Sequence, residues 1–114
     1  MTKLHQKTEI TGTCWIEFNI SGSSEKFEHW QSSSAYASLD SMYEILDVLV
    51  HCFEKFDLYG PPLFVEPQNT KVFIEALDDF SKSAPSSTKA FARDLIDFFS
   101  KSLTGGKPLW ILTV

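Results

Sequence analysis

The stretch Pro108-Leu109-Trp110-Ile111-Leu112-Thr113-Val114 decides the fold. Its side chains are almost all apolar, and apolar surface left in water forgoes roughly 25 cal/mol for each Å² that burial would remove. A segment of this kind belongs in a core. We therefore expect a buried β-strand, apolar on both faces, that lies inside a sheet with helices covering at least one side. We also expect it to close the fold beside the first strand of the chain.

That first strand is predicted over residues 10–20, where apolar and polar side chains alternate with a period of two. The even positions, which include Ile16 and Phe18, are expected to face the core, and the odd positions, which include Glu17 and Asn19, to form a wetter face. After the turn at 21–24, residues 26–31 resemble a returning strand, which makes an N-terminal hairpin.

The middle of the chain begins with a helix. Ser41 and Glu44 fit a capping box, so we expect this helix to run from there to about Asp57. Its wide apolar face predicts a central helix that is covered on more than one side. Leu63-Phe64-Val65 follows two prolines and fits either a short edge strand or a buried loop.

Two more helices are predicted between this segment and the last strand. Pro67 starts the first of them, near Asn69 or Thr70, and the other begins at Ser87 or Thr88 and ends at Gly105-Gly106. On the later helix we expect Asp97 to pair with Arg93 and Lys101, four residues away on either side. The inner face of the earlier helix is expected to carry Val72, Phe73, Ala76, Leu77 and Phe80.

The order of these elements is strand, strand, helix, short strand, helix, helix, strand. It predicts an α+β fold in which a mostly antiparallel sheet, made of the N-terminal hairpin plus the C-terminal strand, is packed with about three helices. A length of 114 residues predicts a single domain over residues 1–114.

The composition excludes several classes of partner. The chain carries 15 acidic and 10 basic residues, a net charge of -5, and it has no run of Lys or Arg. A nucleic-acid partner needs a clustered basic surface, so none is expected. No apolar stretch approaches the ~18 residues of a membrane span. No apolar segment of the kind found in signal peptides follows Met1, so we expect a cytoplasmic protein. Cys14 and Cys52 are too few for a disulfide framework and are expected to be small buried hydrophobes.

Catalytic signals are weak. Asp47 and His51 are four residues apart on a predicted helix, and a carboxylate can orient a histidine base. No serine or cysteine stands at a nucleophile elbow to complete such a set, and a surface pair is the expected reading. The spacings of common metal sites are absent, and Gly105-Gly106 precedes a strand, where a phosphate loop would precede a helix. We therefore predict no enzyme, and no catalytic, cofactor-binding or metal-binding residues.

Carboxylates recur on the predicted helices and suggest a surface that binds a protein partner. The alternative is two ordinary solvated helix faces. Charge complementarity would speed the encounter with a basic partner. The predicted partner-binding residues are Glu44, Asp47, Glu54, Glu75, Asp78 and Asp79.

The whole chain resembles the small acidic immunity proteins that bacteria encode beside secreted toxins, including those of contact-dependent growth inhibition systems. The resemblance lies in the short acidic domain, the strand at 10–20, the acidic helices and the apolar end at 109–114. It implies tight, non-catalytic binding of a cognate toxin, often a basic nuclease, by covering or distorting the toxin's active site.

Two other functions stay open. One is a dimeric, secretion-type chaperone or adaptor, which would present a large exposed apolar patch. The other is a small enzyme, which would present a deep pocket with His51 or His29 and carboxylates. The sequence is compatible with a monomer or a homodimer.

Overall fold

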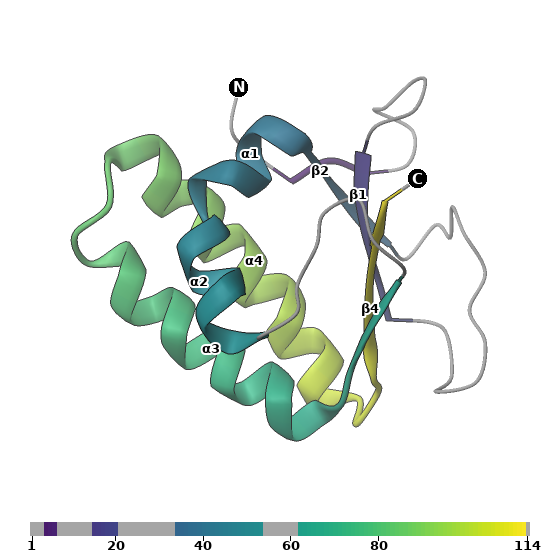
Figure 1. Cartoon of the computed structure of the whole chain (residues 1–114). Helices are drawn as coiled ribbons and strands as arrows, with labels where there is room; N and C mark the ends of the chain where they lie inside the picture. The colour runs from purple at the N-terminus through teal and green to yellow at the C-terminus, as the bar shows by residue number, and fades with distance from the viewer. Residues whose placement is uncertain (1–3, 7–14, 21–33, 54–61, 114) are drawn as a thin grey trace.

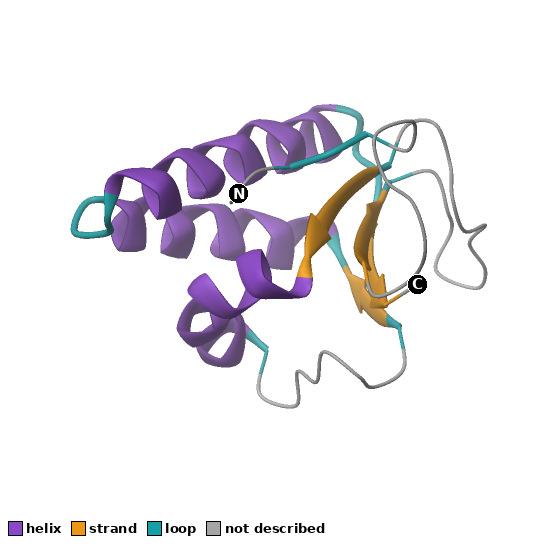
Figure 2. Cartoon of the chain, turned by 90° about the horizontal axis from the view of Figure 1, so that it is seen from above, coloured by secondary structure: helices purple, strands orange, loops and turns teal. Residues whose placement is uncertain are grey.

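A computed structural model describes residues 4–6, 15–20, 34–53 and 62–113. It confirms the α+β class, with a sheet on one side and helices on the other (Figures 1 and 2). The elements in chain order are β1 (Trp15–Asn19), β2 (Ala35–Ser38), α1 (Leu39–Glu44), α2 (Leu46–Cys52), β3 (Leu63–Val65), α3 (Pro67–Ser81), α4 (Ser86–Thr104) and β4 (Leu109–Thr113).

The sheet confirms the place predicted for the last strand. Within the described residues its order is β2-β1-β4-β3, and each neighbouring pair is antiparallel. β4 therefore lies inside the sheet beside β1, with Phe18 opposite Ile111. β3 lies at the edge, as its neighbouring prolines suggested.

β1 pairs with β2, a segment that the sequence pattern did not predict as a strand. The predicted returning strand at 26–31 lies outside the described residues, as do residues 10–14 of the predicted first strand. Residues 4–6 extend the sheet beyond β2 by one bridge. In it the His5 N–H donates to the Tyr36 carbonyl at 2.8 Å, and the Tyr36 N–H donates to the His5 carbonyl at 2.9 Å.

The single helix predicted from Ser41 to about Asp57 is wrong. The helix begins at Leu39, because the Ser38 side chain caps it by accepting the Ser41 N–H at 3.2 Å. The path then breaks at Ile45, whose N–H donates to the Met42 carbonyl, three residues back. Met42 and Ile45 both have fully buried side chains, so the break between α1 and α2 lies against the core. α2 ends at Cys52, and Phe53 is extended.

The last two helices both start at or directly after a proline. α3 begins at Pro67, whose fixed backbone suits the first helical position. α4 begins at Ser86 with Pro85 before it, so the predicted cap at Ser87 or Thr88 is wrong. The predicted stop of α4 is confirmed at Gly106, which takes φ 63°, a left-handed conformation that glycine adopts without strain.

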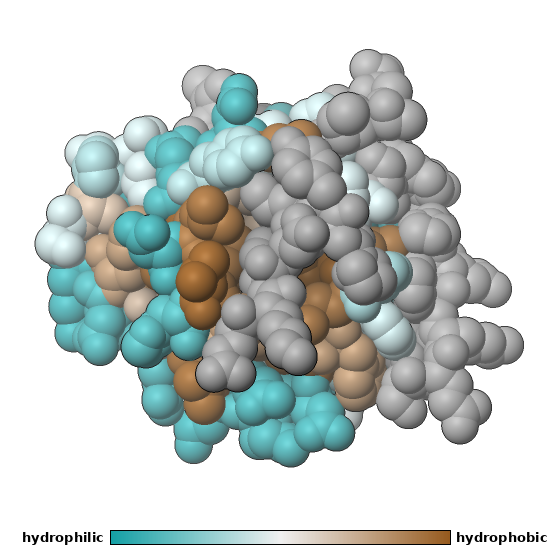
Figure 3. All heavy atoms as spheres, viewed as in Figure 1, coloured by the Kyte–Doolittle hydropathy of each residue, from teal (hydrophilic) through white to brown (hydrophobic). Residues whose placement is uncertain are grey.

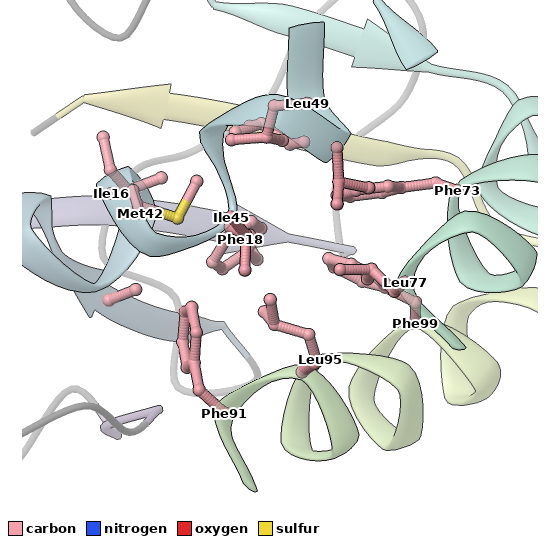
Figure 4. Packing of buried hydrophobic residues seen from close by; sticks show 14 of the residues in the cluster. Ile16, Phe18, Met42, Ile45, Leu49, Phe73, Leu77, Phe91, Leu95 and Phe99 are labelled. Carbon is pink, nitrogen blue, oxygen red and sulfur yellow. The ribbon is translucent and has the colours of Figure 1, made fainter. Parts of the chain in front are cut away.

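The core lies between the helices and one face of the sheet (Figure 4). Aromatic rings form its centre, with Phe99 packed against Phe18 at a centroid distance of 5.4 Å and against Phe73 at 5.1 Å. The fully buried members labelled in Figure 4 are Ile16, Phe18, Met42, Ile45, Leu49, Phe73, Leu77, Phe91, Leu95 and Phe99. Cys52 packs against this core half-buried, and Cys14 lies outside the described residues.

The opposite face of the sheet corrects the prediction of a wetter surface. Glu17 and Asn19 are both 0% exposed. The Glu17 carboxylate accepts hydrogen bonds from the Asn19 amide at 3.0 Å and from the Ser34 hydroxyl at 2.7 Å. Tyr36 lies opposite Glu17 on β2, and burial, helped by the Glu17 charge, raises the pKa of its phenol to about 12. Alternation thus gave the side on which each residue lies, but not its exposure.

Candidate functional site

The structure separates the predicted partner-binding carboxylates into two groups. Glu44 and Asp78 turn toward α4 and take part in the fold. The Thr88 hydroxyl donates a hydrogen bond to the Glu44 carboxylate, and the Arg93 guanidinium lies 2.8 Å from the Asp78 carboxylate. Arg93 therefore pairs with α3, and its predicted pairing with Asp97 is wrong. Glu54 lies outside the described residues.

Asp47, Glu75 and Asp79 form the second group and are exposed. Asp79 meets Lys82 at 3.4 Å, but both side chains are largely in water, so this pair contributes little stability. Asp47 and Glu75 make no ion pair with any residue that the structure describes. Their negative charge is therefore available to a partner.

Exposed apolar side chains accompany these carboxylates. Val50 is 50% exposed and Val72 is 54% exposed, and the structure describes one more large exposed hydrophobic, Tyr43. The prediction that Val72 faces the core is wrong. The buried stripe of α3 runs through Phe73 and Leu77, and Val72 lies outside it on the solvent side of the helix. Helical phase alone could not show this, because Val72 lies one turn from Ala76 and so falls at the edge of the predicted apolar face.

We call this surface the α2–α3 face. Its exposed residues on α2 are Asp47, Val50 and His51, and those on α3, which packs against α2, are Val72, Glu75 and Asp79. Between the two helices lies an open hollow of about 350 Å³, lined by Asp47, Val48, His51 and Ala76. Figure 3 shows hydrophobic residues exposed among hydrophilic ones over α2.

The chemistry of the α2–α3 face suits binding. Asp47 and His51 line one hollow but form no ion pair with each other, and none of the four lining residues carries a nucleophilic hydroxyl or thiol. The nearby Cys52 is half-buried, and burial raises the pKa of its thiol, which keeps it protonated and unreactive at neutral pH. Exposed apolar groups beside charges are typical of protein interfaces, where the apolar groups anchor and the charges orient the partner.

Two further observations concern the described residues alone. No three His, Cys, Asp or Glu side chains among them gather as ligands of a metal ion would. None of the helices formed by these residues has both the length and the apolar character that crossing a membrane requires.

Comparison with known proteins adds no relative to these observations, because no protein-family model, curated protein or solved structure matches the chain.

Proposed function

We propose that this chain is a non-catalytic binding protein, an immunity protein that neutralises a cognate toxin by direct contact in the cytoplasm. The toxin that suits it best is a basic, nuclease-type domain. The observation that carries the proposal is the α2–α3 face, where Val50 and Val72 are exposed and where Asp47 and Glu75 form no ion pair with the described residues.

Charge explains why a basic nuclease fits this face. A nuclease holds the phosphates of its substrate with Lys and Arg side chains, so its substrate groove is positive. On the α2–α3 face, the exposed carboxylates of Asp47 and Glu75 would contact the basic side chains of that groove. Long-range attraction speeds the encounter, and the apolar side chains then slow dissociation. Occupying the groove excludes the nucleic acid and stops cleavage.

The decisive experiment mixes the chain with a basic nuclease domain encoded beside it. We expect a stable complex in size-exclusion chromatography and loss of nuclease activity at equimolar ratio. Failure of the neighbouring domain to bind would remove the proposal. A homodimer in light scattering that buries Val50 and Val72 would favour the chaperone or adaptor instead.

Charge reversal tests the face itself. We expect Asp47→Lys and Glu75→Lys together to lower the association rate constant by roughly tenfold at low salt, because steering depends on charge. Stopped-flow fluorescence measures this rate. The matched control is Asp40→Lys with Glu66→Lys, two exposed carboxylates outside the α2–α3 face whose reversal changes the net charge by the same amount. Equal slowing by the control would mean that net charge acts and the face does not.

A further inference from the structure

A second candidate site lies on another side of the molecule. A cleft of about 570 Å³ opens at the outer edge of the sheet, where residues 4–6, the start of β2 and α4 meet. Residues 4–6 form one wall, held to β2 by the two backbone hydrogen bonds between His5 and Tyr36. We call it the α4–β2 cleft. Its volume falls in the range of pockets that bury a small ligand or a large side chain.

The floor of the α4–β2 cleft is apolar. Leu4, Ile20 and Phe98 line it, and all three are half-buried and pack against the core. Such a floor accepts the aliphatic stem of a guest. The Phe98 ring also offers a flat surface on which a planar cation can stack.

The α4 wall is charged. Asp94 and Asp97 are exposed there, three residues apart and thus on adjacent turns of one side of the helix. Unlike Asp78 and Asp79, neither forms an ion pair with any residue in the described part of the chain. Like charges at this spacing repel, and a cation placed between them relieves the repulsion. Lys101, one turn after Asp97, also lines the cleft.

We propose that the α4–β2 cleft binds an arginine side chain of the basic partner. The stem lies along Leu4 and Phe98, and the guanidinium lies between Asp94 and Asp97. Arginine fits better than lysine, because its planar group can meet two carboxylates at once and stack on a ring. The proposal rests on the proposed function for the source of the arginine. The affinity of the cleft for a guanidinium does not depend on it.

An NMR titration tests the cleft directly, with N-acetyl-arginine methylamide as the probe. We expect saturable shifts of the backbone amides of Asp94, Asp97 and Ala35 in the intact chain. N-acetyl-norleucine methylamide has a similar stem without the charge and should bind at least tenfold more weakly.

Variants of the α4 wall test which side chains hold the probe. Replacing both carboxylates, Asp94→Asn with Asp97→Asn, should weaken binding of the arginine probe at least tenfold. Lys101→Met, which removes a competing positive charge, should strengthen binding two- to fivefold. Asp47→Asn, on the α2–α3 face, is the matched control and should change nothing.

The same variants separate this proposal from the proposed function. Weaker probe binding and weaker toxin binding by the Asp94→Asn, Asp97→Asn variant support the proposal. Absence of saturable shifts, or equal binding of both probes, overturns it. Unchanged toxin affinity in that variant overturns the role of the cleft in the complex, while the proposed function stands. If no toxin binds but the arginine probe does, the proposed function fails and the cleft stands as an arginine site.

Discussion

The two faces of the sheet are buried by different chemistry. The face under the helices carries Ile16 and Phe18, which join a continuous apolar cluster. The other face carries Glu17 and Tyr36, buried as completely, with the carboxylate held by hydrogen bonds from Asn19 and Ser34. One face gains stability from the removal of apolar surface from water. The other buries polar groups, each of which costs free energy unless a hydrogen bond satisfies it.

The two faces of the sheet contribute differently to stability and to the register of the strands. Apolar packing is non-directional, and cores tolerate many apolar arrangements of similar volume. Hydrogen bonds to a buried carboxylate are directional. If β1 slipped by one residue against β2, Glu17 would move to the apolar face, where no partner for its charge is described. The polar face therefore specifies the register of β1 against β2, and the apolar face supplies most of the stability.

The largest effect is expected from Phe99→Ala on the apolar face. Phe99 is fully buried, and its ring packs against Phe18, Phe73 and Phe98. Removing it should lower the free energy of unfolding by about 3–5 kcal/mol, since it loses buried surface and leaves a cavity. Urea denaturation measures the loss. Val72→Ala, on the exposed side of α3, is the control and should lose less than about 0.5 kcal/mol. Similar losses for the two variants would contradict the packing described for α3 and α4.

A smaller effect is expected from Glu17→Leu on the polar face. This change replaces the carboxylate with an apolar group and removes the acceptor of the Asn19 amide and the Ser34 hydroxyl. Leaving two buried donors unsatisfied should lower the free energy of unfolding by about 2–3 kcal/mol.

A double-mutant cycle with Ser34→Ala sharpens that test. When both Glu17 and Ser34 are replaced, no Ser34 hydroxyl remains to be left without an acceptor. The double variant should therefore be at least about 1 kcal/mol more stable than the sum of the single losses predicts. Additive losses would mean that Ser34 and Glu17 do not depend on each other, and the polar face would lose its role in fixing the register.

The sequence predicted the elements whose signal is local or strongly apolar. β4 could be placed inside the sheet because it has no polar face, and Gly106 could end α4 because glycine accepts its left-handed conformation. The segment Ala35–Ser38 gave no such signal, because its side chains are small or mixed and its strand forms only by pairing with β1. The capping box predicted at Ser41 gave way to a local alternative, the Ser38 side chain, which caps α1 three residues earlier.

The candidate site was predictable in part. Exposure of Asp47, Glu75 and Asp79 follows from helical spacing. The contacts of Glu44 and Asp78 with α4 do not, because they join residues far apart in the chain. The sequence pattern paired Asp97 with nearby cations and gave no signal at Asp94. Their place in a cleft depends on how residues 4–6 lie beside α4, which no pattern along the chain encodes.

The smallest effect at neutral pH is expected from Tyr36→Phe, which removes one hydroxyl from the polar face. We expect a loss of about 1 kcal/mol in the free energy of unfolding at pH 7. The pH dependence is more diagnostic. Tyr36 holds its proton more tightly in the folded chain, with a pKa of about 12 against 10.0 for an ordinary tyrosine. Its contribution to stability is therefore complete below pH 10 and is lost as the pH rises from 10 to 12.

Urea denaturation at a series of pH values measures this loss. Between pH 10 and 12 the original chain should lose roughly 2–3 kcal/mol more than Tyr36→Phe, which has no phenol to ionise at this position. If Tyr36→Phe and the original chain lost stability in parallel, the phenol would ionise as readily in the folded chain as in water. The polar face would then be open to solvent, and the two faces would differ in whether water reaches them, not in how they are buried.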